Sequence, residues 1–161
     1  LLVSQAIPFF ALAPLLVLWL GFGLGSKIAM AALIIFFPVT VAFFDGLSRT
    51  EPGFLDLART MGASRWRLLT HVRLPAALPS FASGFRVATA VAPIGAVIGE
   101  WVGSSHGLGY LMLHANARVQ IDMVFACLLI LCAFSITQYF LVDRALRAAL
   151  PWQPDSLKPA K

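Results

Sequence analysis

Serine and histidine side chains gather in one segment of the sequence, where they could supply the nucleophile and base of a hydrolase. They are Ser104, Ser105, His106 and His114. A hydroxyl activated by an imidazole is a common nucleophile in hydrolases. Glycines flank this cluster, however, so the segment offers no rigid platform for a nucleophile. We do not expect the chain to be an enzyme.

Two other kinds of chemistry are also disfavoured. No segment matches the phosphate-binding loop G-x-x-x-x-G-K-[ST], so ATP hydrolysis of that type would need another polypeptide. Cys127 and Cys132 lie in an apolar run without a nearby His or carboxylate, and such a pair forms no recognisable metal site. No metal and no cofactor are therefore expected.

The composition points to a membrane protein. Of 161 residues, 60% are hydrophobic and 12% are charged, whereas a typical soluble domain is about 45–50% apolar and about 25% charged. The mean hydropathy is +0.86. A soluble enzyme and a disordered chain are both excluded by this balance.

Four apolar segments are long enough to span a bilayer. A helix needs roughly 20 residues to cross a hydrocarbon core of about 30 Å. We expect spans at about 1–24, 28–48, 78–101 and 123–143.

Basic residues are unevenly distributed among the segments that connect these spans. Five arginines lie in the loop 49–77, and four of the lysines and arginines lie in the tail 144–161. Only two basic residues lie at the opposite ends of the spans: Lys27, between the first and second spans, and Arg118, in the loop 102–122. The positive-inside rule therefore predicts that the loop 49–77 and the tail are cytoplasmic and that 102–122 is outside.

The cytoplasmic loop has the pattern of two short amphipathic helices. Phe54, Leu57, Ala58 and Met61 follow the spacing i, i+3, i+4, i+7 of one helix face. Gly62 is expected to end this helix in the left-handed conformation.

The second helix of the loop is predicted to begin at Ser64, which could cap it. We expect its apolar residues to share one side and its basic residues to point elsewhere, and we expect Pro75 to close the loop. The apolar residues are Trp66, Leu69 and Val72, and the basic ones are Arg65, Arg67 and His71.

Three functions are open to such a loop. It could lie in the headgroup region with its arginines on anionic lipid, or it could dock a cytoplasmic partner. Ala58, Gly62 and Leu68 also have the spacing of a DNA-binding helix-turn-helix. That third interpretation fails because the bilayer on both sides would keep the loop from reaching a major groove, so no nucleic-acid partner is expected.

The loop resembles the signature of the binding-protein-dependent transport system inner membrane component family, the permease subunits of ATP-binding cassette (ABC) importers. That signature reads Glu-Ala-Ala, three residues, Gly, nine residues, Ile, one residue, Leu-Pro. Its positions fall on Asp56, Leu57, Ala58, Gly62, Val72, Leu74 and Pro75. Asp for Glu keeps the charge, and Leu for Ala enlarges the apolar contact.

The resemblance implies an all-α, polytopic helical membrane protein with the MetI-like ABC permease fold. About four transmembrane helices would be present, together with a two-helix coupling loop that sits in a groove of the ATPase. The implied ATPase-coupling residues are Asp56, Leu57, Ala58, Met61, Gly62, Ala63, Arg65, Val72, Leu74 and Pro75.

The resemblance covers essentially the whole chain. Residues 14–23, 36–47 and 106–111 look like the subgroup that takes up nitrate, sulfonate, taurine and thiamine-precursor pyrimidines. The segments SQAIPFFALAP and ARTMGAS look most like permeases for hydroxymethylpyrimidine. Because the family usually has about six spans, we expect that this chain lacks the first two.

The third span carries the candidate residues of the translocation path, which are Pro93, Gly95, Gly99 and Glu100. Proline permits bending and glycine permits close helix contact, so tight packing is the alternative role. Glu100 could instead pair with Arg118 or cap a turn. Arg86, near the inner end, is expected to extend to the headgroups.

The resemblance also implies the partners. They are two copies of an ABC ATPase, an extracytoplasmic substrate-binding protein and a second permease subunit in the bacterial inner membrane. We expect a homodimer because two ATPases need two coupling loops. The alternative function is a secondary transporter or channel, but the first, second and fourth spans have no ionisable residue in their interiors.

Overall fold

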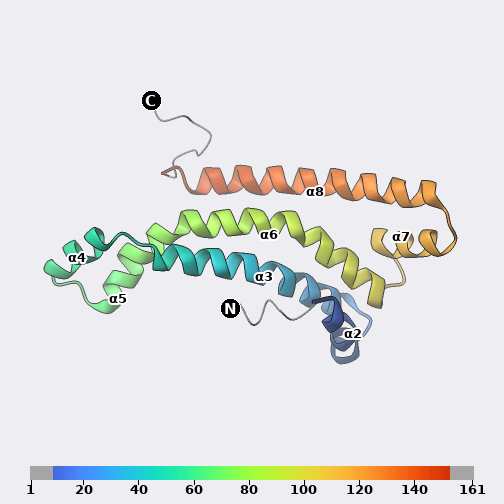
Figure 1. Ribbon diagram of the computed structural model, residues 1–161, viewed down its shortest axis with the longest axis horizontal. Helices are drawn as coiled ribbons and strands as arrows, with labels where there is room; N and C mark the ends of the chain where they lie inside the picture. The colour runs from blue at the N-terminus through green and yellow to red at the C-terminus, as the bar shows by residue number, and fades with distance from the viewer. Residues whose placement is uncertain (1–8, 153–161) are drawn as a thin grey trace.

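The computed structural model describes residues 9–152, and these residues form helices and no strand. The helices are α2 (Phe9–Leu20), α3 (Leu24–Ser48), α4 (Pro52–Thr60), α5 (Arg65–Leu68), α6 (Leu74–Gly103), α7 (Leu108–Ala117) and α8 (Ile121–Ala149), and a π-helical turn, η1 (Leu69–Arg73), joins α5 to α6. The long helices α3, α6 and α8 run side by side (Figure 1). Helices α4 and α5 extend beyond one end of this bundle, here called the loop end. Helices α2 and α7 lie at the opposite, far end.

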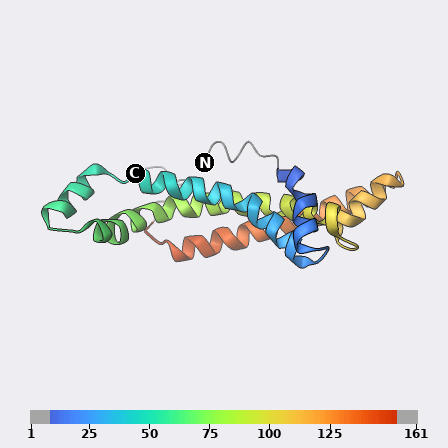
Figure 2. The same ribbon diagram turned by 90° about the horizontal axis from the view of Figure 1, so that it is seen from below.

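Three helical segments are long and apolar enough to cross a membrane. They are Leu24–Ser48, Arg65–Gly103 and Ile121–Ala149, and they contain the second, third and fourth expected spans. The first expected span overlaps α2, whose 12 residues are too few to cross a bilayer alone. Figure 2 shows α2 crossing the start of α3. Residues 1–8 of that span lie outside the described residues, so a membrane crossing by the first expected span stays a prediction.

Small residues bring α3 and α6 into close contact. A Cβ atom on Gly84 would lie 2.5 Å from the Cβ of Ala42 and 2.7 Å from the carbonyl oxygen of Pro38. A Cβ on Gly46 would lie 2.7 Å from the Cβ of Ser80. Only glycine therefore lets the two backbones approach this closely, as in many membrane helix pairs.

Helix α6 begins earlier than expected. We predicted that Pro75 closes the loop and that the span starts near residue 78, but Pro75 lies in the first turn of α6 and α5, η1 and α6 form one continuous helical segment. The prediction that Pro75 ends the helical segment was wrong, whereas the start of the membrane span near residue 78 stays a prediction. A wider π turn ends at Arg73, two residues before Pro75, and the helix continues through the proline.

Helix α8 packs against α6 and α7 but leaves most of its surface uncovered. Phe125, Leu129, Phe134 and Leu141 are all more than half exposed, and only Cys127 of this helix is buried. A helix that is apolar on all sides, and that its own chain leaves mostly uncovered, is stable only when lipid or further protein surrounds it.

Candidate functional site

The first helix of the loop, α4, presents apolar side chains outward at the loop end. Pro52 begins the helix, where its missing N–H costs no hydrogen bond. Phe54 is 58% exposed, Leu57 is 59% exposed and Met61 is 79% exposed. The expected amphipathic helix is therefore present, and its apolar face has no partner within the described residues.

Gly62 makes the bend that follows α4. Its φ angle is +77°, in the left-handed region that we predicted. The N–H of Ala63 donates to the carbonyl of Ala58 at 3.0 Å, and the N–H of Gly62 donates to the carbonyl of Arg59 at 2.9 Å. These two bonds form a Schellman motif, which satisfies the last carbonyls of α4 and fixes the direction of the chain.

The second helix of the loop begins as predicted at Ser64, whose Oγ accepts a hydrogen bond from the N–H of Arg67 at 3.4 Å. The expected division of its faces was wrong in one respect. Trp66 points away at 72% exposure, whereas Leu69 lines a groove together with Arg65 and Arg73. Residues spaced four apart lie on one side of a helix, which explains this grouping.

The remaining signature residues lie in the segment that leads into α6. Val72 and Leu74 are half-buried, and Pro75 is exposed. Asp56 pairs with Arg59 at 3.0 Å, with both side chains exposed. The signature therefore occupies two places: an exposed bend around Gly62, and the continuous helix that connects this bend to a membrane-spanning helix.

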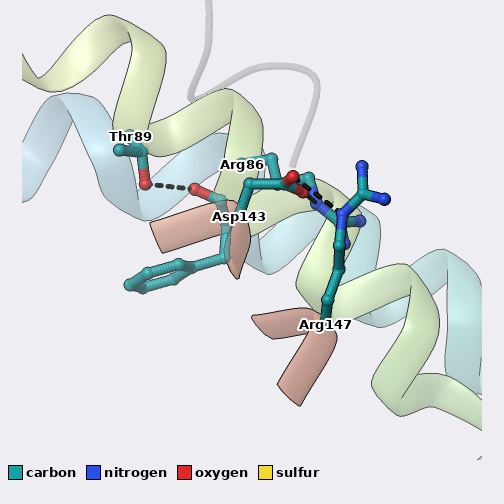
Figure 3. Close-up of polar contacts among 5 residues, drawn as sticks. Arg86, Thr89, Asp143 and Arg147 are labelled. Atoms are coloured by element: carbon teal, nitrogen blue, oxygen red, sulfur yellow. Dashed lines mark hydrogen bonds and ion pairs between the residues drawn. The ribbon is translucent and has the colours of Figure 1, made fainter. Parts of the chain in front are cut away.

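An ion pair joins α6 to α8 near the loop end (Figure 3). Nε of Arg86 donates to Oδ1 of Asp143 at 2.6 Å, and Nε of Arg147 donates to Oδ2 at 2.8 Å. The side chains of Arg86 and Asp143 are only 20% and 15% exposed. Arg86 is therefore neutralised by a carboxylate on the neighbouring helix, and its extension to the headgroups stays a prediction.

The signature residues and the whole set of helices match one known family. The family model of the binding-protein-dependent transport system inner membrane component matches residues 1–151. The chain belongs to this family. Its membership confirms the expected helical permease fold, and together with the three long apolar helices it indicates a multi-pass inner-membrane protein.

Several permeases are similar to this chain. A probable ABC transporter permease protein of Haemophilus influenzae is 65% identical over 143 residues, which are 89% of this chain and 58% of that protein. The formylaminopyrimidine transport permease protein ThiX of Halalkalibacterium halodurans is 40% identical over 95% of this chain and 61% of its own. The putative aliphatic sulfonates transport permease protein SsuC of Bacillus subtilis is 34% identical over 92% of this chain and 54% of its own.

The chain thus spans between 54% and 61% of the length of these three permeases. The names of the second and third of these permeases agree with the subgroup that the sequence resembles. No solved structure is significantly similar to the chain.

At the far end of this permease-family chain, Glu100 caps α7, a helix that we did not predict within the loop 102–122. Oε2 of Glu100 accepts the N–H of Gly109 at 2.6 Å, and Glu100 forms no ion pair with Arg118 in the described structure. Gly107 has a φ of +123°, and a Cβ there would lie 2.3 Å from the Glu100 carboxylate. The turn-capping role is therefore confirmed.

The serines and histidines of the far end lie in the turn between α6 and α7 or in α7 itself, and Oγ of Ser105 lies 3.1 Å from Nδ1 of the adjacent His106. Nζ of Lys27 donates to Oγ of Ser104 at 2.7 Å, and this hydroxyl bonds the backbone of His106. Residues 103–107 do read G-x-S-x-G, but the segment joins two helices instead of a strand and a helix. The hydroxyl of Ser104 holds the turn between α6 and α7.

The candidate path residues have different surroundings. Gly95 and Gly99 are buried against α3, where their Cβ atoms would lie 3.0 Å and 3.2 Å from the Cα atoms of Ala31 and Lys27. Pro93 is half-buried. The glycines thus have a packing role, and a role of this helix in the translocation path stays a prediction.

Proposed function

We propose that this chain is part of the membrane-spanning subunit of an ATP-driven importer, and that the segment 49–77 couples it to a separate ATPase. The observation that carries this proposal is the outward apolar face of α4, formed by Phe54, Leu57 and Met61. Exposed apolar residues beside charged ones are typical of the centre and rim of a protein interface. The continuous helix from Arg65 to Gly103 supplies a stiff connection from that face into the membrane.

The loop end is cytoplasmic in this proposal. It carries Arg49, Arg65, Arg67, Arg144 and other basic residues, as the positive-inside rule requires. Two ATPases, a second copy of the permease and an extracytoplasmic substrate-binding protein would complete the importer. The solute that we favour is a small polar molecule, either a thiamine-precursor pyrimidine or an anion such as a sulfonate, taurine or nitrate.

The coupling role is tested with Gly62→Asp. This change adds a charge at the bend and disfavours its backbone conformation, so uptake and transport-stimulated ATP hydrolysis should both be lost while the protein still inserts. Gly53→Asp is the matched control. Position 53 lies in the first turn of α4 with no atom within 4 Å of an added Cβ, so it should retain both activities.

Co-purification and ligand identification test the wider assignment. The chain should be isolated in detergent with its ATPase and binding protein, and the bound solute identified by mass spectrometry. Full uptake and ATPase stimulation in Gly62→Asp, or no association of an ATPase with the wild-type chain, would overturn the proposal.

A further inference from the structure

A groove lies between the two helical parts of the loop. It has a volume of about 320 Å³ and is lined by Leu55, Arg59, Arg65, Leu68, Leu69 and Arg73. Three guanidinium groups thus surround a space whose remaining walls are leucine side chains. A ligand that matches this groove needs a negative charge and carbon-rich groups next to it.

Two of the three arginines are not neutralised. Arg59 pairs with Asp56 at 3.0 Å. Within residues 9–152, Arg65 and Arg73 form no ion pair. A guanidinium group binds phosphate oxygens through two parallel hydrogen bonds. Arg65 and Arg73 can therefore bind a phosphate, because no carboxylate of the described residues pairs with them.

The groove lies on another side of α4 than the outward apolar face that we assign to the ATPase, although Arg65, one of the implied coupling residues, also lines the groove. Leu55 and Arg59, four residues apart, form one side of α4. Phe54, Leu57 and Met61 form the outward apolar side of the same helix. A protein bound to that outward side would leave the groove available to a second ligand.

The groove also lies directly next to the membrane-spanning part of the chain. Arg73 immediately precedes α6, the helix that crosses the bilayer, and α4 and α5 lie at the end of the bundle (Figure 1). Basic residues beside a span attract anionic lipids of the cytoplasmic leaflet. Leu68 and Leu69 would contact the glycerol and first acyl carbons, which a free phosphate ion lacks.

We propose that this groove binds the phosphate of an anionic phospholipid headgroup through Arg65 and Arg73. The lipid would join α4 to the α5–η1 segment and so hold the angle at Gly62. This proposal rests on the cytoplasmic placement of the loop end that we proposed above, and it does not depend on coupling to an ATPase.

Native mass spectrometry of the purified chain with phosphatidylglycerol or phosphatidylcholine tests the proposal. The wild type should retain phosphatidylglycerol in preference to phosphatidylcholine. The double variant Arg65→Gln/Arg73→Gln should lower that retention about tenfold or more, since each basic residue near the surface contributes to anionic lipid binding. Arg49→Gln/Arg144→Gln is the matched control because it removes the same charge at the same end but outside the groove, and it should bind like the wild type.

Several results would overturn the proposal. Equal retention of both lipids, or unchanged phosphatidylglycerol in a folded Arg65→Gln/Arg73→Gln variant, would show that the groove is no anionic lipid site. If inorganic phosphate displaces the bound phosphatidylglycerol as effectively as added phosphatidylglycerol does, the groove is a site for the free ion. If the Arg65→Gln/Arg73→Gln variant loses its association with the ATPase but retains the lipid, the groove belongs to a protein interface. Leu57→Glu, which places a charge on the outward face of α4 but outside the groove, should weaken coupling and keep the lipid, so the two proposals can fail independently.

Discussion

Gly62 directs the loop through its backbone conformation alone. No atom lies within 4 Å of the position of a Cβ on this residue, so a substitution adds no clash. It adds only the cost of the left-handed conformation, about 1–2 kcal/mol for most residues and less for Asn. Gly62→Val should therefore lower stimulated ATP hydrolysis severalfold in reconstituted vesicles, whereas Gly62→Asn should keep most of it. Equal activity of the valine and glycine forms would show that the bend is not needed.

Asp143 is the residue whose loss should most affect the contact between α6 and α8. Asp143→Asn would leave the half-buried guanidinium of Arg86 without its charged partner, which costs about 2–4 kcal/mol. We expect a lower melting temperature in detergent. The double variant Arg86→Met/Asp143→Leu should recover much of this loss, because an apolar pair needs no neutralisation.

The exposed Arg144→Gln is the control for that comparison and should melt like the wild type. If Asp143→Asn and Arg144→Gln have the same melting temperature, the ion pair does not stabilise the helix contact.

At the scale of elements, the contact between α3 and α6 depends on the absence of side chains. Gly84→Ala would place a methyl group 2.5 Å from the Cβ of Ala42 and 2.7 Å from the carbonyl of Pro38, and such overpacking costs about 1–3 kcal/mol. We expect a lower midpoint of unfolding. Gly25→Ala is the control, because a Cβ there meets no atom within 4 Å. A midpoint as high for Gly84→Ala as for Gly25→Ala would contradict the close-packing role.

Elements that depend on near neighbours in the sequence could be predicted. The end of α4 at Gly62 and the cap at Ser64 are set by hydrogen bonds that span three to five residues, and these appear in the residue spacing. The start of α6 could not be predicted in the same way. Proline usually marks the end of a segment, and nothing in the local pattern indicates that the helix continues through Pro75 after a π turn.

At the scale of the whole molecule, contacts between distant residues were the part that the sequence did not provide. Asp143 lies 57 residues from Arg86, and Glu100, for which capping a turn was one expectation, caps α7, a helix that was not predicted. Both contacts depend on how the helices pack. Periodicity predicts which residues lie in a helix, but it does not predict which charged residues of two helices meet.

The topology makes a prediction for the intact cell. With Cys127 and Cys132 replaced by serine, a cysteine at the exposed position Thr60 should react with a membrane-impermeant maleimide only after permeabilisation. A cysteine at the exposed position Ser105 should react in intact cells. Labelling of Thr60→Cys from outside would reverse the proposed orientation.

The contact of Arg86 with Asp143 divides the long helical segment into two arms of similar length. The segment runs from Arg65 to Gly103, so 21 residues precede Arg86 and 17 follow it (86 − 65 and 103 − 86). At a rise of about 1.5 Å per residue, these arms extend about 32 Å and about 26 Å. If the ion pair serves as a fulcrum, a tilt of the segment would move the loop and the turn before α7 by nearly equal distances in opposite directions.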